Sequence, residues 1–345
     1  MNHTFGSDNY SGVHPEIMEA LIRANHGHAT SYGADEYTAK AIEKFKQYFG
    51  RDIEVFFVYN GTGANVLGLS SMARPYHGII CSELAHIQVD ESTATETFIG
   101  CRQITLPTTD GKIYPHDIDA KIQRLDDQHH PQAKVISISQ PTEYGTVYSI
   151  DEIKRISAVA KRYDLYLHMD GARISNAAVG LNKNFREFTR DAGVDVLSFG
   201  GTKNGMMFGE AIIFFRNELA TDFKYIRKQG MQLHSKMRFI GAQFDALLSN
   251  ECWKRNASHS NDMAKFLAEE LRQIPQVDIT QSVDANGVFV KIPAQIIPLL
   301  QQEQFFYVWT EKVSEARLMC SFDTRKEDIE NFVRKLRQLL SDLQL

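Results

Sequence analysis

The sequence predicts an α/β fold in which a large domain with a mostly parallel sheet is followed by a smaller C-terminal α+β domain. Three observations support this: helical and strand-like segments alternate through most of the chain, the strand-like segments are short and apolar, and the pattern changes near residue 245. Such alternation is typical of a parallel sheet covered by helices on both faces. A chain of 345 residues can bury a core in each part. We predict domains at 1–245 and 246–345.

Two kinds of segment follow one another in the large domain. In the first kind, apolar residues recur with helical spacing, and Pro15 and Pro115 stand where the first turn of a helix accepts proline. The second kind consists of aliphatic, β-branched and aromatic runs, as expected of buried strands. Helices are predicted at 15–24, 38–49, 115–125 and 150–163, and strands at 54–59, 78–83, 102–107, 134–140, 164–169, 194–200 and 210–216.

The pattern changes near Ala242. From there the sequence predicts one long helix that includes 261–274, then four short strands with hairpin-like spacing, and a closing helix. This order of elements is typical of an α+β unit. The strands are predicted at 277–282, 287–293, 305–311 and 316–322, and the closing helix at 326–343.

Composition and charge favour a small-molecule ligand. The chain is 43% hydrophobic and 23% charged with a formal net charge of -5, and it has no basic cluster of the kind that nucleic acids or anionic membranes require. The start has no secretory signal, and no apolar run is long enough to span a bilayer, so a cytoplasmic protein is expected. The four cysteines lie far apart without a C-x-x-C pair, which favours buried thiols over a metal site or disulfides.

The candidate binding and catalytic residues lie at the carboxyl ends of the predicted strands, because parallel α/β sheets bind ligands at that edge. The first such segment, 58–69, contains Gly61, Thr62 and Gly63 between a strand and a helix expected to begin near Ala64. A turn of this kind offers backbone amides, a hydroxyl and a helix dipole to a phosphate. The sequence matches neither G-x-x-x-x-G-K-[ST] nor G-x-G-x-x-G, which argues against nucleotide triphosphates and dinucleotides.

The second segment is “LYLHMDGARISNA”, in which Asp170 leaves a buried strand and Arg173 follows one helical turn later. A surface ion pair would stabilise the fold little. The carboxylate is suited to keeping a heterocyclic nitrogen protonated, and the arginine to gripping a substrate carboxylate with two hydrogen bonds. A structural pair at the end of the strand is the alternative.

The third and fourth segments supply an amine and an imidazole. Lys203 lies between two apolar strands and is framed by glycines and Thr202, so that partial desolvation would lower its pKa and make it a nucleophile that forms a Schiff base. His86 follows another strand and is placed to stack on a flat ring or to move a proton, although a lone histidine is more often structural. Together the four segments predict a site for pyridoxal phosphate.

The order of these segments resembles the aspartate-aminotransferase-like fold, and within it the chain resembles the threonine aldolase family over nearly its whole length. The segment “HMDGARISNA” is similar to the family's His-x-Asp-Gly-Ala-Arg-x-x-Asn-Ala nearly residue for residue, and “NGTGAN” resembles its Gly-Thr-x-x-Asn turn. Four further segments carry the resemblance: “FGSDN” with Ser7 and Asp8, “SYGADEYT” with Tyr32, “KMRFIGA” with Arg238, and “ARLMCSFD” with Arg317.

The resemblance implies a pyridoxal-phosphate enzyme of fold type I with specific roles for these residues. It implies that Lys203 holds the cofactor as a Schiff base, that Asp170 contacts the pyridine nitrogen, and that His86 stacks on the ring. Arg238 would reach the phosphate from the same or a neighbouring subunit. The implied cofactor-binding residues are Gly61, Thr62, His86, Asp170, Arg173, Thr202, Lys203 and Arg238, and the implied substrate-binding residues are Ser7, Tyr32, Arg173 and Arg317.

Two segments depart from the family pattern. Thr202 and Asn204 flank the lysine where most members have serine and glycine, so that a hydroxyl is kept. In “QPTEYG”, Glu143 stands where the family's Glu-Asn-Thr-His-Asn-Gly has a histidine that contacts the substrate hydroxyl. A carboxylate can still accept that proton. The predicted catalytic residues are therefore Lys203, His86 and Glu143, with the base on the hydroxyl left open between the last two.

The predicted activity is retro-aldol cleavage of L-threonine, L-allo-threonine or a related β-hydroxy-α-amino acid such as phenylserine to glycine and an aldehyde. The resemblance also implies a homodimer or tetramer with shared active sites. A β-eliminating lyase on the same scaffold is the nearest alternative. A non-catalytic binding module is less favoured, because the lysine, the aspartate and both arginines are retained.

Overall fold

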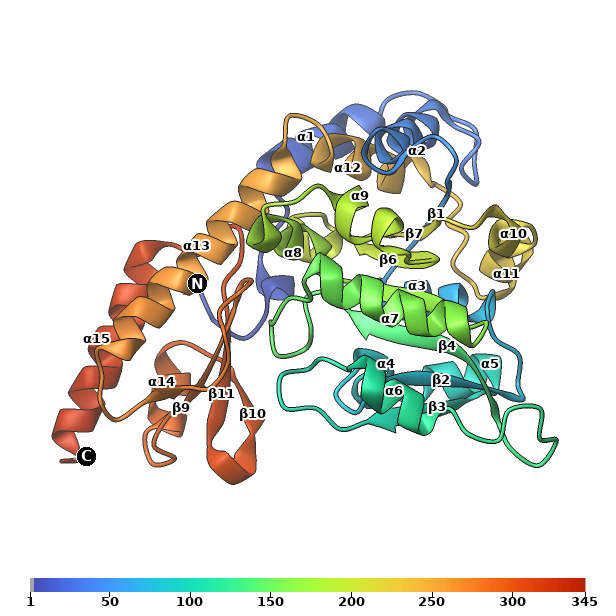
Figure 1. Cartoon of the computed structure of the whole chain (residues 1–345). Helices are drawn as coiled ribbons and strands as arrows, with labels where there is room; N and C mark the ends of the chain where they lie inside the picture. The colour runs from blue at the N-terminus through green and yellow to red at the C-terminus, as the bar shows by residue number, and fades with distance from the viewer. Residues whose placement is uncertain (1–2, 345) are drawn as a thin grey trace.

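The computed structural model describes residues 3–344, and a seven-stranded sheet forms its larger part (Figure 1). Its strands are β1 (Glu54–Val58), β2 (His77–Ser82), β3 (Arg102–Leu106), β4 (Gln132–Ser139), β5 (Tyr166–Gly171), β6 (Val196–Gly200) and β7 (Glu210–Phe214). The spatial order is β1-β7-β6-β5-β4-β2-β3. All pairs from β6 to β3 are parallel, whereas β7 is antiparallel to both neighbours. This confirms the predicted mostly parallel sheet.

Helices cover both faces of this sheet, as the alternation along the chain predicts. The core on one face contains side chains of α1 (Pro15–Ala24), α2 (Glu36–Phe49), α6 (Pro115–Lys121), α7 (Ile150–Arg162), α8 (Ile174–Leu181), α9 (Phe185–Phe188) and α12 (Arg238–Leu247). The core on the other face contains side chains of α3 (Gly61–Ser70), α4 (His86–Val89), α5 (Ala94–Ile99), α10 (Asn217–Ala220) and α11 (Phe223–Gln229). Local signals set several helix starts; Ser149 and Glu152, for example, form a capping box on α7.

The smaller part is a four-stranded antiparallel sheet covered by helices. The strands are β8 (Asp278–Ile279), β9 (Gly287–Lys291), β10 (Tyr307–Thr310) and β11 (Glu315–Met319), in the order β10-β11-β9-β8. The helices α13 (Cys252–Arg272), α14 (Ile297–Glu303) and α15 (Lys326–Asp342) pack in its core. Phe5 belongs to the same core and joins the sheet through hydrogen bonds to the backbones of Phe305 and Met319, each 2.9 Å long.

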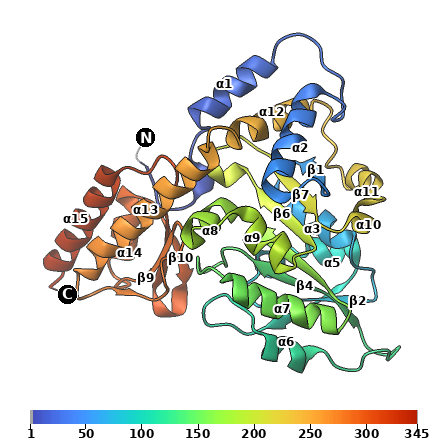
Figure 2. The same ribbon diagram turned by 45° about the horizontal axis from the view of Figure 1, so that its top comes forward.

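The prediction of one long helix from Ala242 is wrong. α12 ends at Leu247 and α13 begins at Cys252, because Asn250 and Glu251 take left-handed conformations with φ of 50° and 53°. Such a backbone cannot continue a right-handed helix. α13 then leads towards the small sheet, whereas α12 packs beside α1 at the edge of the molecule (Figure 2). The division into domains at residue 245 stays a prediction.

The carboxyl ends of the parallel strands face the small sheet. Arg173, which follows β5, and Arg317, which lies in β11, line one small cavity together with Glu143, which follows β4. The predicted ligand-binding edge is therefore closed over by the second sheet. No helix among residues 3–344 has the length and apolar character that a membrane span requires.

Candidate active site

The glycine turn after β1 forms the first turn of a helix. α3 begins at Gly61, three residues earlier than predicted, and Asn60 caps it by accepting the Gly63 N–H at 2.8 Å. The N–H groups of Gly61 and Thr62 have no acceptor inside the helix, because the first turn of any helix lacks them. Space is also open at Gly61, where a Cβ would meet no atom within 4 Å. The turn can therefore receive an anion.

Asp170 and His86 are joined through two residues that are not among the predicted site residues, Asn65 and Glu91. Asn65 on α3 uses one amide group to donate to Asp170 Oδ2 at 2.8 Å and to Glu91 Oε1 at 2.9 Å. The same Glu91 oxygen pairs with His86 Nδ1 at 2.9 Å. A continuous chain of hydrogen bonds thus runs from the predicted ring-nitrogen partner to the predicted ring-stacking residue. It fixes the orientation of both.

This network shifts the pKa values of the two residues at its ends, His86 and Asp170. The hydrogen bond that His86 donates to Glu91 raises the pKa of His86 above its usual value, although burial opposes it. Burial acts to raise the pKa of Asp170, but the charge of His86 and hydrogen bonds from the Ala172 N–H and Asn65 hold it below the usual value. The site therefore holds Asp170 as a carboxylate and makes the His86 imidazole easier to protonate, both on the sheet face that carries α3.

Lys203 lies in the short 3₁₀ helix η3 (Thr202–Asn204), directly after β6. Burial, followed by the nearby charge of Arg173, lowers the pKa of its amine, while Asp8 and Asp170 oppose the shift. A lowered pKa increases the fraction of neutral, nucleophilic amine. The structure thus brings Lys203 into the electrostatic range of Asp170 and Arg173, as the sequence predicts for a shared site.

The two predicted carboxylate-binding arginines are engaged differently. Arg173 donates from Nε and Nη2 to the two oxygens of the buried Asp8, at 2.6 and 2.8 Å. In contrast, Arg317 has one long bond, from Nη2 to the Gly6 carbonyl at 3.4 Å, and its buried Nε has no hydrogen-bond partner within residues 3–344. Burial lowers the Arg317 pKa to about 10. Arg317 is the guanidinium with unused donors, and Arg173 is held in place by Asp8.

Glu143 lies on the same cavity as both arginines. Its Oε1 accepts hydrogen bonds from the Ser139 hydroxyl at 2.6 Å and from the His86 N–H at 3.0 Å. Its Oε2 is buried and has no partner in the described part of the chain. Burial raises the Glu143 pKa to about 7, although the Ser139 hydrogen bond opposes this. A carboxyl group with one free oxygen and such a pKa is suited to general base chemistry.

Ser7, Thr202, Tyr32 and Arg238 divide into two groups. Ser7 precedes Asp8 and accepts the Asn9 N–H at 3.2 Å, and Thr202 precedes Lys203, so both lie beside the cluster. Tyr32 is half exposed, and its N–H donates to the Ser235 carbonyl at 3.0 Å. Arg238 donates to the Gly27 carbonyl at 3.0 Å. Tyr32 therefore lies on the protruding loop between α1 and α2 (Figure 2), whereas Arg238 is the first residue of α12 and contacts that loop. Among the described residues, neither side chain hydrogen-bonds to the cluster.

Five residues of the cluster were not predicted: Asp8, Asn65, Glu91, Glu210 and Asn286. Asn65 stands four residues after Gly61, which places it on the same helix face, and that spacing was a usable signal. Glu210 opens an otherwise apolar buried strand, where a charge needs a reason. Asn286 donates to Asp8 at 3.1 Å, but no pattern in the sequence singles it out.

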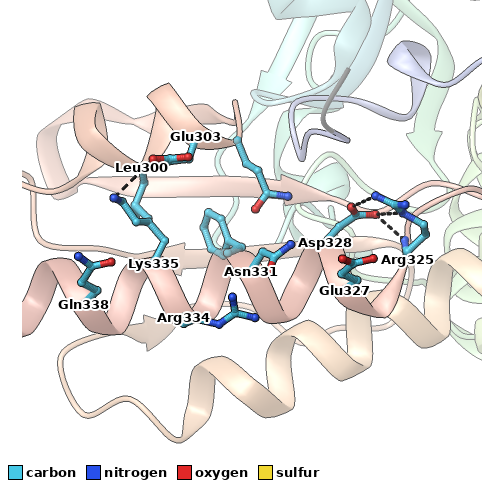
Figure 3. Close-up of a pocket in the computed structure, with 11 residues that line it drawn as sticks. Leu300, Glu303, Arg325, Glu327, Asp328, Asn331, Arg334, Lys335 and Gln338 are labelled. Carbon is cyan, nitrogen blue, oxygen red and sulfur yellow. Dashed lines mark hydrogen bonds and ion pairs between the residues drawn. The ribbon is translucent and has the colours of Figure 1, made fainter.

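A polar groove along α15 lies outside this site. Arg325 and Asp328 form an ion pair at 2.7 Å at one end, and Lys335 pairs with Glu303 at 3.4 Å at the other (Figure 3). None of the predicted site residues lines it. Its cations and anions already neutralise one another.

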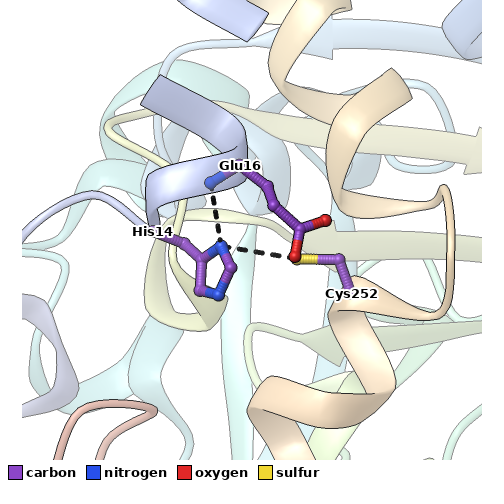
Figure 4. A group of neighbouring side chains, drawn as sticks. All are labelled: His14, Glu16 and Cys252. Carbon is purple, nitrogen blue, oxygen red and sulfur yellow. Dashed lines mark hydrogen bonds between the residues drawn. The ribbon is translucent and has the colours of Figure 1, made fainter. Parts of the chain in front are cut away.

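A second cluster joins α1 to α13. His14, Glu16 and Cys252 place three potential metal-ligating atoms within 4.8 Å of one another (Figure 4). However, His14 Nδ1 accepts the Glu16 N–H at 3.3 Å, and the Glu16 carboxylate pairs with Arg255. Burial also raises the Cys252 pKa to about 11, which disfavours the thiolate that metals bind. We interpret these contacts as a cap on α1.

Comparison with known proteins places this geometry in a family. Residues 4–295 match the model of the family described as beta-eliminating lyase. The chain is 44% identical over 338 residues to a low specificity L-threonine aldolase of a Pseudomonas species, covering 98% of each chain. It is 45% identical over 343 residues to that of Pseudomonas aeruginosa, covering 98% of this chain and 99% of the relative.

The fold agrees with a solved structure of the same group. A threonine aldolase from Leishmania major superposes with a TM-score of 0.93 at 30% identity, covering 98% of this chain and 99% of that one. This match confirms the predicted large α/β domain with its smaller α+β companion. The chain belongs to the beta-eliminating lyase family, and within that family to the threonine aldolases.

Proposed function

We propose that this protein cleaves β-hydroxy-α-amino acids, L-threonine and L-allo-threonine among them, to glycine and an aldehyde. The observation that carries the proposal is the small cavity lined by Arg173, Arg317 and Glu143, whose buried Oε2 has no hydrogen-bond partner among the described residues. Arginines are suited to holding a carboxylate, and the carboxylate of Glu143 to accepting a hydroxyl proton. The relatives named threonine aldolase support the same reaction.

The residues present fit pyridoxal phosphate. The amine of Lys203 is buried and has a lowered pKa, Asp170 is a buried carboxylate, and the open turn at Gly61 and Thr62 offers free N–H groups. The fit depends on three groups at one edge of the sheet: a nucleophilic amine, an anion and a turn that can receive a phosphate. Bound there, the cofactor would supply an electron sink that stabilises the carbanion left at Cα.

The arginines orient the substrate. We propose that Arg317 binds the substrate carboxylate through its free Nε, assisted by the Ser7 hydroxyl, and that Arg173 supports it from its fixed place on Asp8. Holding the carboxylate on one side places the Cα–Cβ bond for cleavage by restricting its rotation. Residues of the small sheet line one side of the cavity, and burial of the arginines there strengthens these charge interactions.

Glu143 is the proposed base on the substrate hydroxyl. The pairing with Glu91 raises the pKa of His86, so that the imidazole is more fully protonated near neutral pH and less able to accept a proton. Glu143, in contrast, has a free oxygen and a pKa near 7. These observations favour Glu143 over His86, and His86 retains the proposed part of stacking on the cofactor ring.

The pH dependence tests this assignment. Because the ionised form of Glu143 is the active one, kcat/KM is expected to fall about tenfold per pH unit below about pH 7 and to level off above it. Ser139→Ala removes the hydrogen bond that lowers this pKa, so the acidic limb should move to higher pH. Glu143→Gln should remove the limb and reduce kcat/KM by about 10²- to 10⁴-fold. An acidic limb unmoved by both changes would assign the proton transfer to another group.

A second copy of the chain is proposed to complete the site. Tyr32 lies on the exposed loop between α1 and α2, and Arg238 lies at the start of α12 against that loop, both away from the cluster, so one cation of the predicted phosphate site is missing within one chain. A symmetric dimer can carry this loop of one subunit to the glycine turn of the other. The assembly is proposed to be a homodimer, or a tetramer built from such dimers.

An assay of products decides the reaction class. We expect L-threonine and L-allo-threonine to give acetaldehyde and phenylserine to give benzaldehyde, each with one equivalent of glycine. Serine and cysteine are the comparison substrates, since a β-eliminating lyase converts them to pyruvate and ammonia. Pyruvate from serine without aldehyde from the three β-hydroxy substrates would replace the aldolase proposal with the lyase. No turnover of any substrate by protein that carries the cofactor would favour a binding module.

A further inference from the structure

Glu210 is a buried carboxyl group that the proposed reaction does not use. It is the first residue of β7 and lies at the same edge of the sheet as the predicted site, because it pairs with Val58 at the end of β1 and with Gly200 at the end of β6. Its side chain is 7% exposed. An ionisable group buried to this degree needs partners, since burial without them is costly.

The side chain faces the helix that carries the anion-receiving turn. Side chains alternate along a strand, and Ile212 and Phe214, which share the face of Glu210, pack in the core beneath α3. α3 itself begins three residues after Val58, the partner of Glu210 on β1. Glu210 therefore lies between the glycine turn that is proposed to bind the phosphate and the turn that carries Lys203.

The carboxyl group holds the lysine turn directly. Its Oε2 accepts the Gly201 N–H at 2.9 Å, and the Thr202 hydroxyl also hydrogen-bonds to it. The charged groups that face it are Lys203 from η3 and Asp170 from β5. Burial raises its pKa to about 7, and the two hydrogen bonds oppose the shift. Near pH 8 it is about nine-tenths ionised on this basis.

We propose that Glu210 is a positioning residue that holds the Gly201–Thr202 turn in place for Lys203 and takes up one proton when the cofactor's phosphate binds at the neighbouring turn. The inference rests on the proposed cofactor. A phosphate dianion next to a buried carboxylate makes ionisation of the carboxyl unfavourable, so the proton comes from solvent and no covalent bond changes. The neutral carboxyl keeps an oxygen for the Gly201 N–H and gains an O–H that can donate.

The number of protons taken up when the cofactor binds tests this role of Glu210. Calorimetric titration of the apoprotein with pyridoxal phosphate at pH 8, in two buffers of different ionisation enthalpy, gives the number of protons taken up. At this pH the phosphate is itself a dianion, because its second pKa is about 6. We expect the wild type to take up close to one proton more than Glu210→Gln. Correspondingly, between pH 7.5 and 8.5 the Kd of the wild type for pyridoxal phosphate should rise with pH more steeply than that of Glu210→Gln, by up to about tenfold per pH unit.

Two controls separate this role from a merely structural one. Glutamine can still accept the Gly201 N–H, so Glu210→Gln should keep the fold, checked by circular dichroism, while losing the linkage. The wild type should bind pyridoxal, which lacks the phosphate, without taking up the extra proton. Comparing the two ligands on the wild type tests the inference even if the variant does not fold. Equal proton uptake by wild type and variant, or by wild type with both ligands, overturns the inference. Failure of the wild type to bind pyridoxal phosphate at all overturns the proposed function instead.

Discussion

Lys203→Ala is expected to abolish covalent attachment of the cofactor and to reduce turnover by at least about 10²- to 10⁴-fold, the range for losing a positioned group that transfers protons. The reason is that this amine combines three properties: it is buried, its pKa is lowered, and it lies within the range of Asp170 and Arg173. Borohydride reduction followed by mass spectrometry should find the cofactor mass on the peptide that contains Lys203 in the wild type. The variant should show no modified peptide.

A matched control is Lys134→Ala. That lysine pairs with Asp164 at 2.8 Å near the amino end of β4, whereas the predicted site lies at the carboxyl ends of the strands. This variant should retain both the modification and wild-type turnover. Cofactor attached to another lysine in wild-type protein, or undiminished activity of Lys203→Ala, would remove the basis of the proposed function.

Asp170→Asn is expected to lower kcat by about 10²- to 10³-fold, the size seen when one preorganised electrostatic contact to developing charge is lost. The asparagine keeps the size of the side chain and the hydrogen bond from the Ala172 N–H at 2.9 Å, but it carries no charge. The ring nitrogen would then no longer be held protonated. Because Lys203 is untouched, the cofactor should still attach, and the visible absorbance of the protein should persist with an altered pH dependence.

The split between kcat and cofactor attachment makes this prediction specific. Asp164→Asn is the control, since that carboxylate is 97% exposed and lies outside the site. Asn65→Ala provides a graded test, because it removes a hydrogen bond to Asp170 without removing the charge, and its effect on kcat should be smaller. If Asp170→Asn retained the wild-type kcat, the role of the Asp170 carboxylate would be only structural.

Regular elements of the fold were predictable because their signals are local. Pro15 and the apolar repeat behind it fix α1, and the apolar runs of β6 and β7 are buried at every residue. The break after α12 was not predictable, because it depends on left-handed conformations at Asn250 and Glu251, and nothing in their sequence demands them. Strand order was likewise out of reach, since the antiparallel insertion of β7 between β1 and β6 is a property of the whole sheet.

The site shows the same division between local and distant information. Gly61 and Lys203 follow β1 and β6, and Asp170 lies near the end of β5. These strands end at one edge of the sheet, which places the three residues near one another. Their partners lie elsewhere in the chain: Asp8 reaches Arg173 from the N-terminal segment, and Glu91 meets Asn65 from the loop after α4. Pairings over such separations depend on tertiary packing, which spacing along the chain does not encode.

The attachment of Phe5 to the backbones of Phe305 and Met319 has a consequence for synthesis of the protein. These first residues leave the ribosome early, but the strand that receives them is made about 300 residues later, which at roughly 5–20 residues per second takes about 15–60 s. The same segment carries Asp8, the buried counter-charge of Arg173, three residues after Phe5. The backbone anchor of the segment that supplies Asp8 is therefore complete only after β11 has been synthesised.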